Sequence, residues 1–135
     1  YKNAEDINKK AKIATAQVNT GMSRSAACAQ LRLVAVEPVK YETAGNIGGD
    51  LFRFPRNNEV IELRANHKAD LVCLVSEAGG GGVARGRYSV IARHTLMKSG
   101  WTLGHEVGHN FGCAHGRGHS FIVNGAGYYT SMLNL

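Results

Sequence analysis

The residues best suited to chemistry lie in one run of eleven, from His105 to His115. Two histidines in this run, His105 and His109, stand four positions apart. On a helix, residues at this spacing share a face with Cβ atoms roughly 5–6 Å apart, so both imidazoles can point at one metal ion. Neutral imidazole binds Zn²⁺ well. Glu106 follows the first histidine directly, so its carboxylate can reach a metal-bound water without joining the coordination shell.

A glycine predicts where this helix ends and how a third ligand arrives. Gly112 can take the left-handed conformation that commonly follows a helix, because it has no Cβ to clash. The reversal of the chain then brings His115 back towards the other two histidines. Three histidines leave the fourth position on zinc for water, which is typical of a catalytic site and not of a closed structural one. We therefore predict one catalytic Zn²⁺ bound by His105, His109 and His115.

The run matches the extended zinc signature His-Glu-x-x-His-x-x-Gly-x-x-His at every fixed position, and the chain resembles the metzincin metallopeptidases. Residues 70–72 before a glycine-rich loop, and residues 125–128, resemble the reprolysin-like branch, including its secreted bacterial members. The resemblance implies a secreted zinc endopeptidase acting on a protein or peptide substrate. It also implies a methionine turn at residues 129–134, in which Met132 forms a hydrophobic floor beneath the metal.

The implied reaction is hydrolysis of a peptide bond by a metal-activated water. Glu106 would take the proton from that water as general base and deliver it to the leaving amine as general acid. Asn134 stands where some metzincins carry an additional tyrosine ligand, so no tyrosine ligand is expected there. His119 is an extra histidine near the site, either a loop residue or a fourth ligand.

Three departures from the family pattern bear on completeness. The usual first strand has no counterpart, the chain stops three residues after Met132, and Gly116 stands where many reprolysin-like proteins carry Asp. We therefore expect a catalytic domain truncated at both ends. The alternatives are a catalytically impaired zinc-binding module, an incomplete peptidase fragment, or a small-molecule hydrolase using the same metal.

Length and composition limit the other classes of function. The 135 residues predict a single domain, and 44% hydrophobic with 19% charged residues is ordinary for a globular protein. No apolar run approaches the ~20 residues of a membrane span. A net charge of +6 can indicate nucleic-acid binding, but the basic residues are dispersed and no nucleic-acid motif accompanies them. We expect a monomer without a nucleic-acid partner.

The three cysteines allow at most one internal disulfide. Cys28 and Cys113 are the preferred pair if a bridge exists, and the sequence leaves this open.

Hydrophobic periodicity predicts an α/β fold with a twisted, mostly parallel sheet and an irregular C-terminal part. Helices are predicted at residues 6–20, 58–68 and 99–111, and strands at residues 30–39, 70–76, 83–85 and 88–93. Gly21 is the predicted stop of the first helix. In the metal-binding helix, Leu103, Val107 and Phe111 form a predicted buried stripe, and Gly104 and Gly108 form a row of small residues. The resemblance divides the domain into an upper part, 1–112, and a lower part, 113–135, with the third ligand and the methionine turn.

Residues 83–93 are the candidate edge strand along which an extended substrate binds. Arg85, Arg87 and Arg93 in this segment suggest a preference for acidic substrates, unless they are solvated surface charges. The four glycines at 79–82 predict a mobile connector ahead of this strand.

Overall fold

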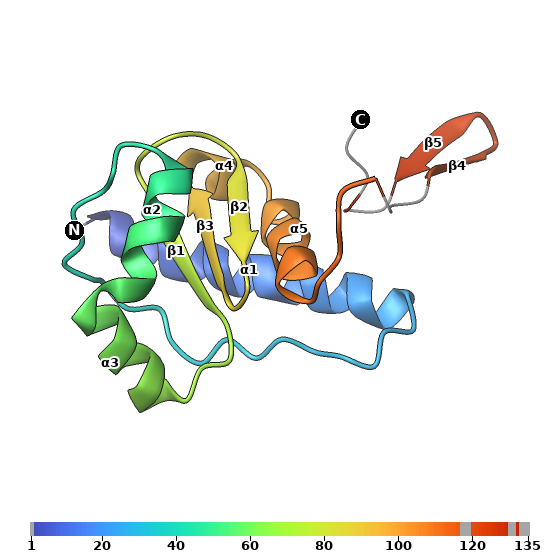
Figure 1. The fold of residues 1–135 in the computed structure, drawn as a ribbon. Coiled ribbons are helices and arrows are strands. Elements are labelled where there is room, and N and C mark those ends of the chain that lie inside the picture. The colour runs from blue at the N-terminus through green and yellow to red at the C-terminus, as the bar shows by residue number, and fades with distance from the viewer. Residues whose placement is uncertain (1, 117–119, 130–131, 133–135) are drawn as a thin grey trace.

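A computed structural model describes residues 2–116, 120–129 and 132. Figure 1 shows a small sheet with helices on both faces and a separate hairpin near the C-terminus. The helices are α1 (Lys2–Arg24), α2 (Ile47–Arg53), α3 (Asn58–His67), α4 (Arg93–Lys98), α5 (Trp101–Asn110) and the 3-10 helix η1 (Phe54–Arg56). The strands are β1 (Val72–Ser76), β2 (Gly82–Arg85), β3 (Tyr88–Ala92), β4 (Ser120–Val123) and β5 (Ala126–Tyr129). Among the described residues, no helix is long and apolar enough to cross a membrane.

The main sheet has the order β1-β3-β2 and is mixed. Strands β1 and β3 are parallel, with Val72 opposite Tyr88, whereas β2 and β3 are antiparallel, with Arg85 opposite Tyr88. The prediction of a mostly parallel sheet therefore holds for one of these two pairings. The reason is the short connection at Gly86, which has a positive φ of 59° and can only return the chain antiparallel.

Residues 30–39 do not form the predicted strand. They form neither helix nor strand, and no strand of the described residues pairs with them. Backbone groups near both ends of this segment bind side chains instead. Leu31 N donates to Asn19 Oδ1 at 2.7 Å, and Asn19 Nδ2 donates to Leu31 O at 2.8 Å. Lys40 N donates to Glu59 Oε2 at 2.9 Å. A strand requires a neighbouring backbone, which an alternating sequence cannot supply alone.

Two hydrophobic clusters cover the opposite faces of the sheet. On one face Ile91 packs with Ala14 of α1 and Leu96 of α4. On the other face Val90 packs with Phe54 of η1 and Val60 of α3, and Figure 1 shows α2 and α3 on one side of the sheet. Because Val90 and Ile91 are neighbours on a strand, their side chains point to opposite faces, and both are fully buried.

Helix α1 is longer than predicted, and Gly21 lies inside it instead of ending it. A Cβ built on Gly21 would lie 3.5 Å from Cζ3 of Trp101, so this glycine faces a packed aromatic ring. Helix α3 begins at Asn58, as predicted, and the residue before it is its N-cap: Asn57 Oδ1 accepts from Val60 N at 3.2 Å.

The predicted irregular C-terminal part contains the β4–β5 hairpin. Its turn is Asn124-Gly125, with φ values of 51° and 80°. Asn-Gly with two positive φ angles is the most favourable two-residue hairpin turn, so the sequence carried a signal for this element. The three cysteines are free and exposed, so Cys28 and Cys113 are not bridged.

A buried carboxylate connects α2 to the carboxyl end of β1. Asp50 is fully buried and accepts hydrogen bonds from Ala44 N at 2.6 Å, Ser76 Oγ at 2.7 Å, Thr43 Oγ1 at 2.9 Å and Tyr41 Oη at 3.0 Å. Burial alone would raise the pKa of Asp50, but these hydrogen bonds outweigh it and lower the pKa. Burial and the bond to Asp50 raise the pKa of Tyr41 to about 12.

Candidate metal centre and active site

Helix α5, which carries the first two predicted ligands, ends as the sequence predicts. Gly112 has a φ of 89°, its N donates to His109 O at 2.9 Å, and Cys113 N donates to Gly108 O at 2.9 Å. These two bonds form the Schellman arrangement that closes a helix at a left-handed residue. The chain then turns back along the end of α5, which returns His115 to the face that carries His105 and His109.

The three predicted ligand atoms converge. Nε2 of His115 lies 2.8 Å from Nε2 of both His105 and His109, and those two atoms are 3.1 Å apart. Four donors at ~2.0–2.1 Å from Zn²⁺ in a tetrahedron are about 3.3 Å apart, so all three nitrogens are within reach of a single ion. The pKa of His115 is lowered, most strongly by desolvation and then by the electrostatic effects of His109 and His105. A lowered pKa favours the neutral imidazole, which is the form that binds a metal.

A backbone carbonyl that the sequence did not reveal orients one of these rings. Nδ1 of His109 lies 2.8 Å from Cys113 O. A carbonyl can only accept, so Nδ1 carries the proton and Nε2 presents its lone pair to the other two histidines. A partner of this kind usually fixes the tautomer and orientation of a metal ligand. The Schellman turn therefore positions His109 as well as His115.

Glu106 lies beside the cluster and is buried, with 3% of its surface exposed. Its Oε2 atom is buried without a hydrogen-bond partner among the described residues. Burial raises the pKa of Glu106, and the nearby His105 and His109 oppose this with a smaller effect. An unpaired buried carboxylate oxygen is costly unless the site supplies a partner, and a water held beside a metal ion would be one.

The residue opposite Glu106 is Gly82, the first residue of β2. A Cβ built on Gly82 would lie 2.5 Å from Oε1 of Glu106 and 2.9 Å from its Cδ. No side chain fits there, so the glycine leaves the space that the carboxylate occupies. No sequence pattern indicated this contact, because the two residues are far apart along the chain. One residue of the preceding glycine loop is hydrogen-bonded on both sides. Gly81 N donates to Thr95 Oγ1 at 2.9 Å, and Gly81 O accepts from Ala92 N at 2.9 Å.

A cleft of about 690 Å³ joins these groups. Its walls come from β2, from the start of α5 and from the histidine cluster. The lining residues are Gly82, Val83, Ala84, Ser99, Trp101, Thr102, His105, Glu106, His109 and His115. Strand β2 is the edge of the sheet beside this cleft, whereas β3 is central, so the candidate edge strand narrows to Gly82–Arg85.

Gly104 and Gly108, the row of small residues on α5, each face a side chain from another part of the chain. A Cβ on Gly108 would lie 2.5 Å from Sδ of Met132, and one on Gly104 would lie 3.3 Å from Cγ2 of Val18. Met132 therefore packs on helix α5. Residues 130, 131 and 133–135 of the predicted methionine turn, Asn134 included, and also His119, lie outside the described residues.

The predicted stripe on α5 is only partly buried. Val107 is buried and Leu103 packs against the core, but Phe111 is 55% exposed. Phe111 caps the end of the helix, where the chain turns away from the core. Asn110 is a further residue that the sequence did not single out. Its Nδ2 donates to Gly86 O at 2.8 Å and to Tyr88 O at 3.1 Å, which fastens the end of α5 to the β2–β3 turn.

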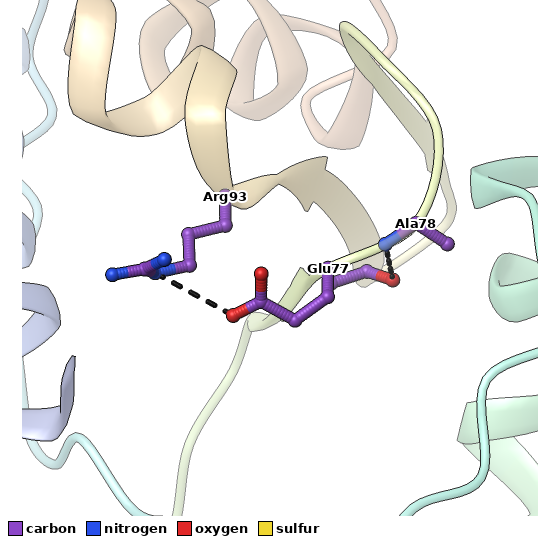
Figure 2. Close-up of polar contacts among 4 residues, drawn as sticks. Glu77, Ala78 and Arg93 are labelled. Carbon is purple, nitrogen blue, oxygen red and sulfur yellow. Dashed lines mark hydrogen bonds and ion pairs between the residues drawn. The ribbon is translucent and has the colours of Figure 1, made fainter. Parts of the chain in front are cut away.

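The three candidate arginines lie outside the cleft lining. Nε of Arg93, at the start of α4, lies 3.5 Å from Oε1 of Glu77, as Figure 2 shows. Beside this pair, Ala78 N donates to Ser76 Oγ at 3.2 Å. Arg85 and Arg87 are exposed at the β2–β3 turn.

Taken together, this architecture is that of a metzincin metallopeptidase: a helix and the glycine turn after it gather three histidines beside the edge strand of a small mixed sheet. The chain belongs to metallopeptidase family M12B, reprolysin-like, whose family model matches residues 8–116. The matched range includes the three histidines and Glu106, and ends before Met132. No curated protein and no solved structure gives a match to the chain.

Proposed function

We propose that this chain is a zinc-dependent endopeptidase that hydrolyses peptide bonds with Glu106 as the general base. The observation that carries the proposal is the convergence of three Nε2 atoms, all within 3.1 Å of one another, beside a buried and unpaired carboxylate. Membership of a metallopeptidase family supports the same reaction class.

Each side chain has a separate role in this proposal. His105, His109 and His115 would hold one Zn²⁺. When bound, zinc supplies a Lewis acid that polarises the scissile carbonyl and acidifies a neighbouring water. Glu106 accepts the proton of the attacking water, for which its raised pKa makes it a stronger base than an ordinary carboxylate. It then returns this proton to the leaving amine.

In this proposal the substrate binds along the edge strand β2. An extended peptide that pairs with an exposed edge gains main-chain hydrogen bonds, and its alternate side chains face the cleft. Gly82, Val83 and Ala84 of this strand line the cleft opposite the metal-binding helix. A peptide bound there would pass Glu106 with its backbone close to the histidine cluster.

The test combines metal content with proteolysis. Chain saturated with zinc and then desalted is expected to retain one zinc per chain and to cleave labelled casein, with loss on chelation and recovery on adding zinc. Glu106→Gln is expected to keep the zinc and to lose activity by about 10²–10⁴-fold, the usual contribution of a general base. His115→Ala is expected to lose both. Full activity of Glu106→Gln would refute the base assignment, and failure to retain zinc would refute the metal site.

A zinc-binding module without peptidase activity is the second candidate. The exposure of His115 and of the residues around it favours this, because an open site excludes water poorly. Retention of one zinc per chain with no cleavage of casein under any metal loading would support it over the peptidase.

A further inference from the structure

Trp101 stands where a substrate side chain would enter the cleft. It is the first residue of α5 and lies four positions before His105, so both side chains are on one side of the helix. It lines the cleft together with His105 and Glu106, yet 54% of its surface is exposed. Half-exposed tryptophan leaves a large apolar area in water that a bound ligand can cover.

The indole ring has a fixed support on its far edge. A Cβ on Gly21 of α1 would lie 3.5 Å from Cζ3 and 3.9 Å from Cη2 of Trp101, so the benzene edge of the ring rests against this helix. The backbone at Trp101 is held as well, because its N donates to Ser99 Oγ at 3.3 Å. A supported ring loses little freedom when a ligand packs on it, which favours binding.

The opposite wall of the cleft is apolar. It is formed by Val83 and Ala84 of β2, and no arginine or lysine is among the cleft-lining residues. A peptide paired with β2 would direct every second side chain towards α5. The side chain nearest the histidine cluster would then lie between this apolar wall and Trp101.

We propose that Trp101 determines specificity, and that the cleft selects a substrate with an aromatic side chain next to the scissile bond. This inference rests on the proposed peptidase function. An aromatic ring that packs offset or edge-to-face on another ring gains binding free energy beyond that of burying the same apolar area. Phe or Tyr should therefore be preferred over Leu as well as over Ala. Acidic side chains gain nothing at this position, because Arg93 is paired with Glu77 and lies outside the cleft lining.

The test uses small ligands that carry a zinc-chelating group, so that binding is measured without turnover. The hydroxamates of N-acetyl-phenylalanine, N-acetyl-leucine and N-acetyl-alanine are titrated into the zinc-loaded chain by calorimetry. The phenylalanine compound is expected to bind about tenfold more tightly than the alanine compound, with leucine between them. Trp101 is the only tryptophan of the chain, so its emission should also change more with the phenylalanine compound.

Three variants separate a specific role from a structural one. Trp101→Ala should reduce the phenylalanine-to-alanine ratio to within about twofold, while Trp101→Phe should keep most of it. Phe111→Ala removes an equally exposed aromatic residue, the C-cap of the same helix, which is not among the cleft-lining residues, and should leave the ratio unchanged. Circular dichroism and retained zinc verify that each variant is folded.

An unchanged ratio in Trp101→Ala, or equal affinities of the wild-type chain for the three compounds, would overturn the role of Trp101 alone. If the chain retains no zinc and binds none of the three hydroxamates, the proposed function is overturned together with this inference.

Discussion

The contact between Gly82 and Glu106 makes the positioning of the proposed general base testable with one methyl group. In Gly82→Ala the new Cβ would lie 2.5 Å from Oε1, far closer than carbon and oxygen atoms pack. Gly82 is a paired strand residue opposite Ile91 and is not among the residues with positive φ, so its backbone accepts alanine. The carboxylate of Glu106 is therefore what must move, while the three histidine rings keep their places.

The expected loss of catalytic rate follows from the displacement of the Glu106 carboxylate. Moving a reacting group by about 1 Å costs roughly 10²-fold in rate, which corresponds to about 2.7 kcal/mol in activation free energy. Overpacking of this kind lowers stability by about 1–3 kcal/mol. We expect hydrolysis of labelled casein to fall about 100-fold in kcat/KM, with one zinc per chain retained in the desalted protein.

A matched substitution controls for the effect of adding a methyl group to a glycine. Gly48→Ala in α2 places its Cβ 3.5 Å from Asn46 Oδ1, which is an ordinary contact, and Gly48 is not a cleft-lining residue. It should retain wild-type kcat/KM. If Gly82→Ala keeps more than half of the wild-type rate, or if it loses its zinc, the contact does not position Glu106 as we infer.

Three further predictions concern the elements around the site. The lowered pKa of Asp50 means that its contribution to stability is present above the ordinary carboxyl pKa of about 3.9 and is lost as the pH falls through the lowered value. In urea unfolding between pH 2 and 7, Asp50→Asn should make the free energy of unfolding depend less on pH in the acid range and should lower it by about 3–5 kcal/mol at neutral pH. An unchanged pH dependence in the acid range would contradict this prediction. Gly112→Ala places a side chain at a φ of 89° and should cost about 1–2 kcal/mol in thermal unfolding, with weaker zinc retention because His115 shifts, whereas Gly112→Asn should cost less. Equal effects of the two substitutions would argue against backbone strain. Asn110→Ala removes the two bonds to the β2–β3 turn and should cost about 1–3 kcal/mol in urea unfolding. A cost of zero would mean that these bonds do not hold α5 to the sheet.

Local patterns account for the parts that the sequence predicted well. Helix α3 and strand β1 lie within two residues of their predicted bounds, because their periodicity and the glycines and polar residues around them are local signals. The convergence of the three histidines is also local. It depends on a four-residue helical spacing and on one glycine with a positive φ, both of which can be read within eleven residues.

The tertiary structure decided everything that depends on two distant segments meeting. Residues 30–39 alternate like a strand, but strand formation needs a partner backbone, and the bonds of Asn19 and Glu59 hold the segment elsewhere. The space that Gly82 leaves for Glu106, and the support that Gly21 gives to Trp101, are contacts between elements that are far apart in the chain. The sequence by itself thus determined which residues can bind a metal, because ligand geometry is set by short-range spacing. Only the fold decided which strand borders them and how Glu106 is buried, because those distances depend on packing across the whole chain.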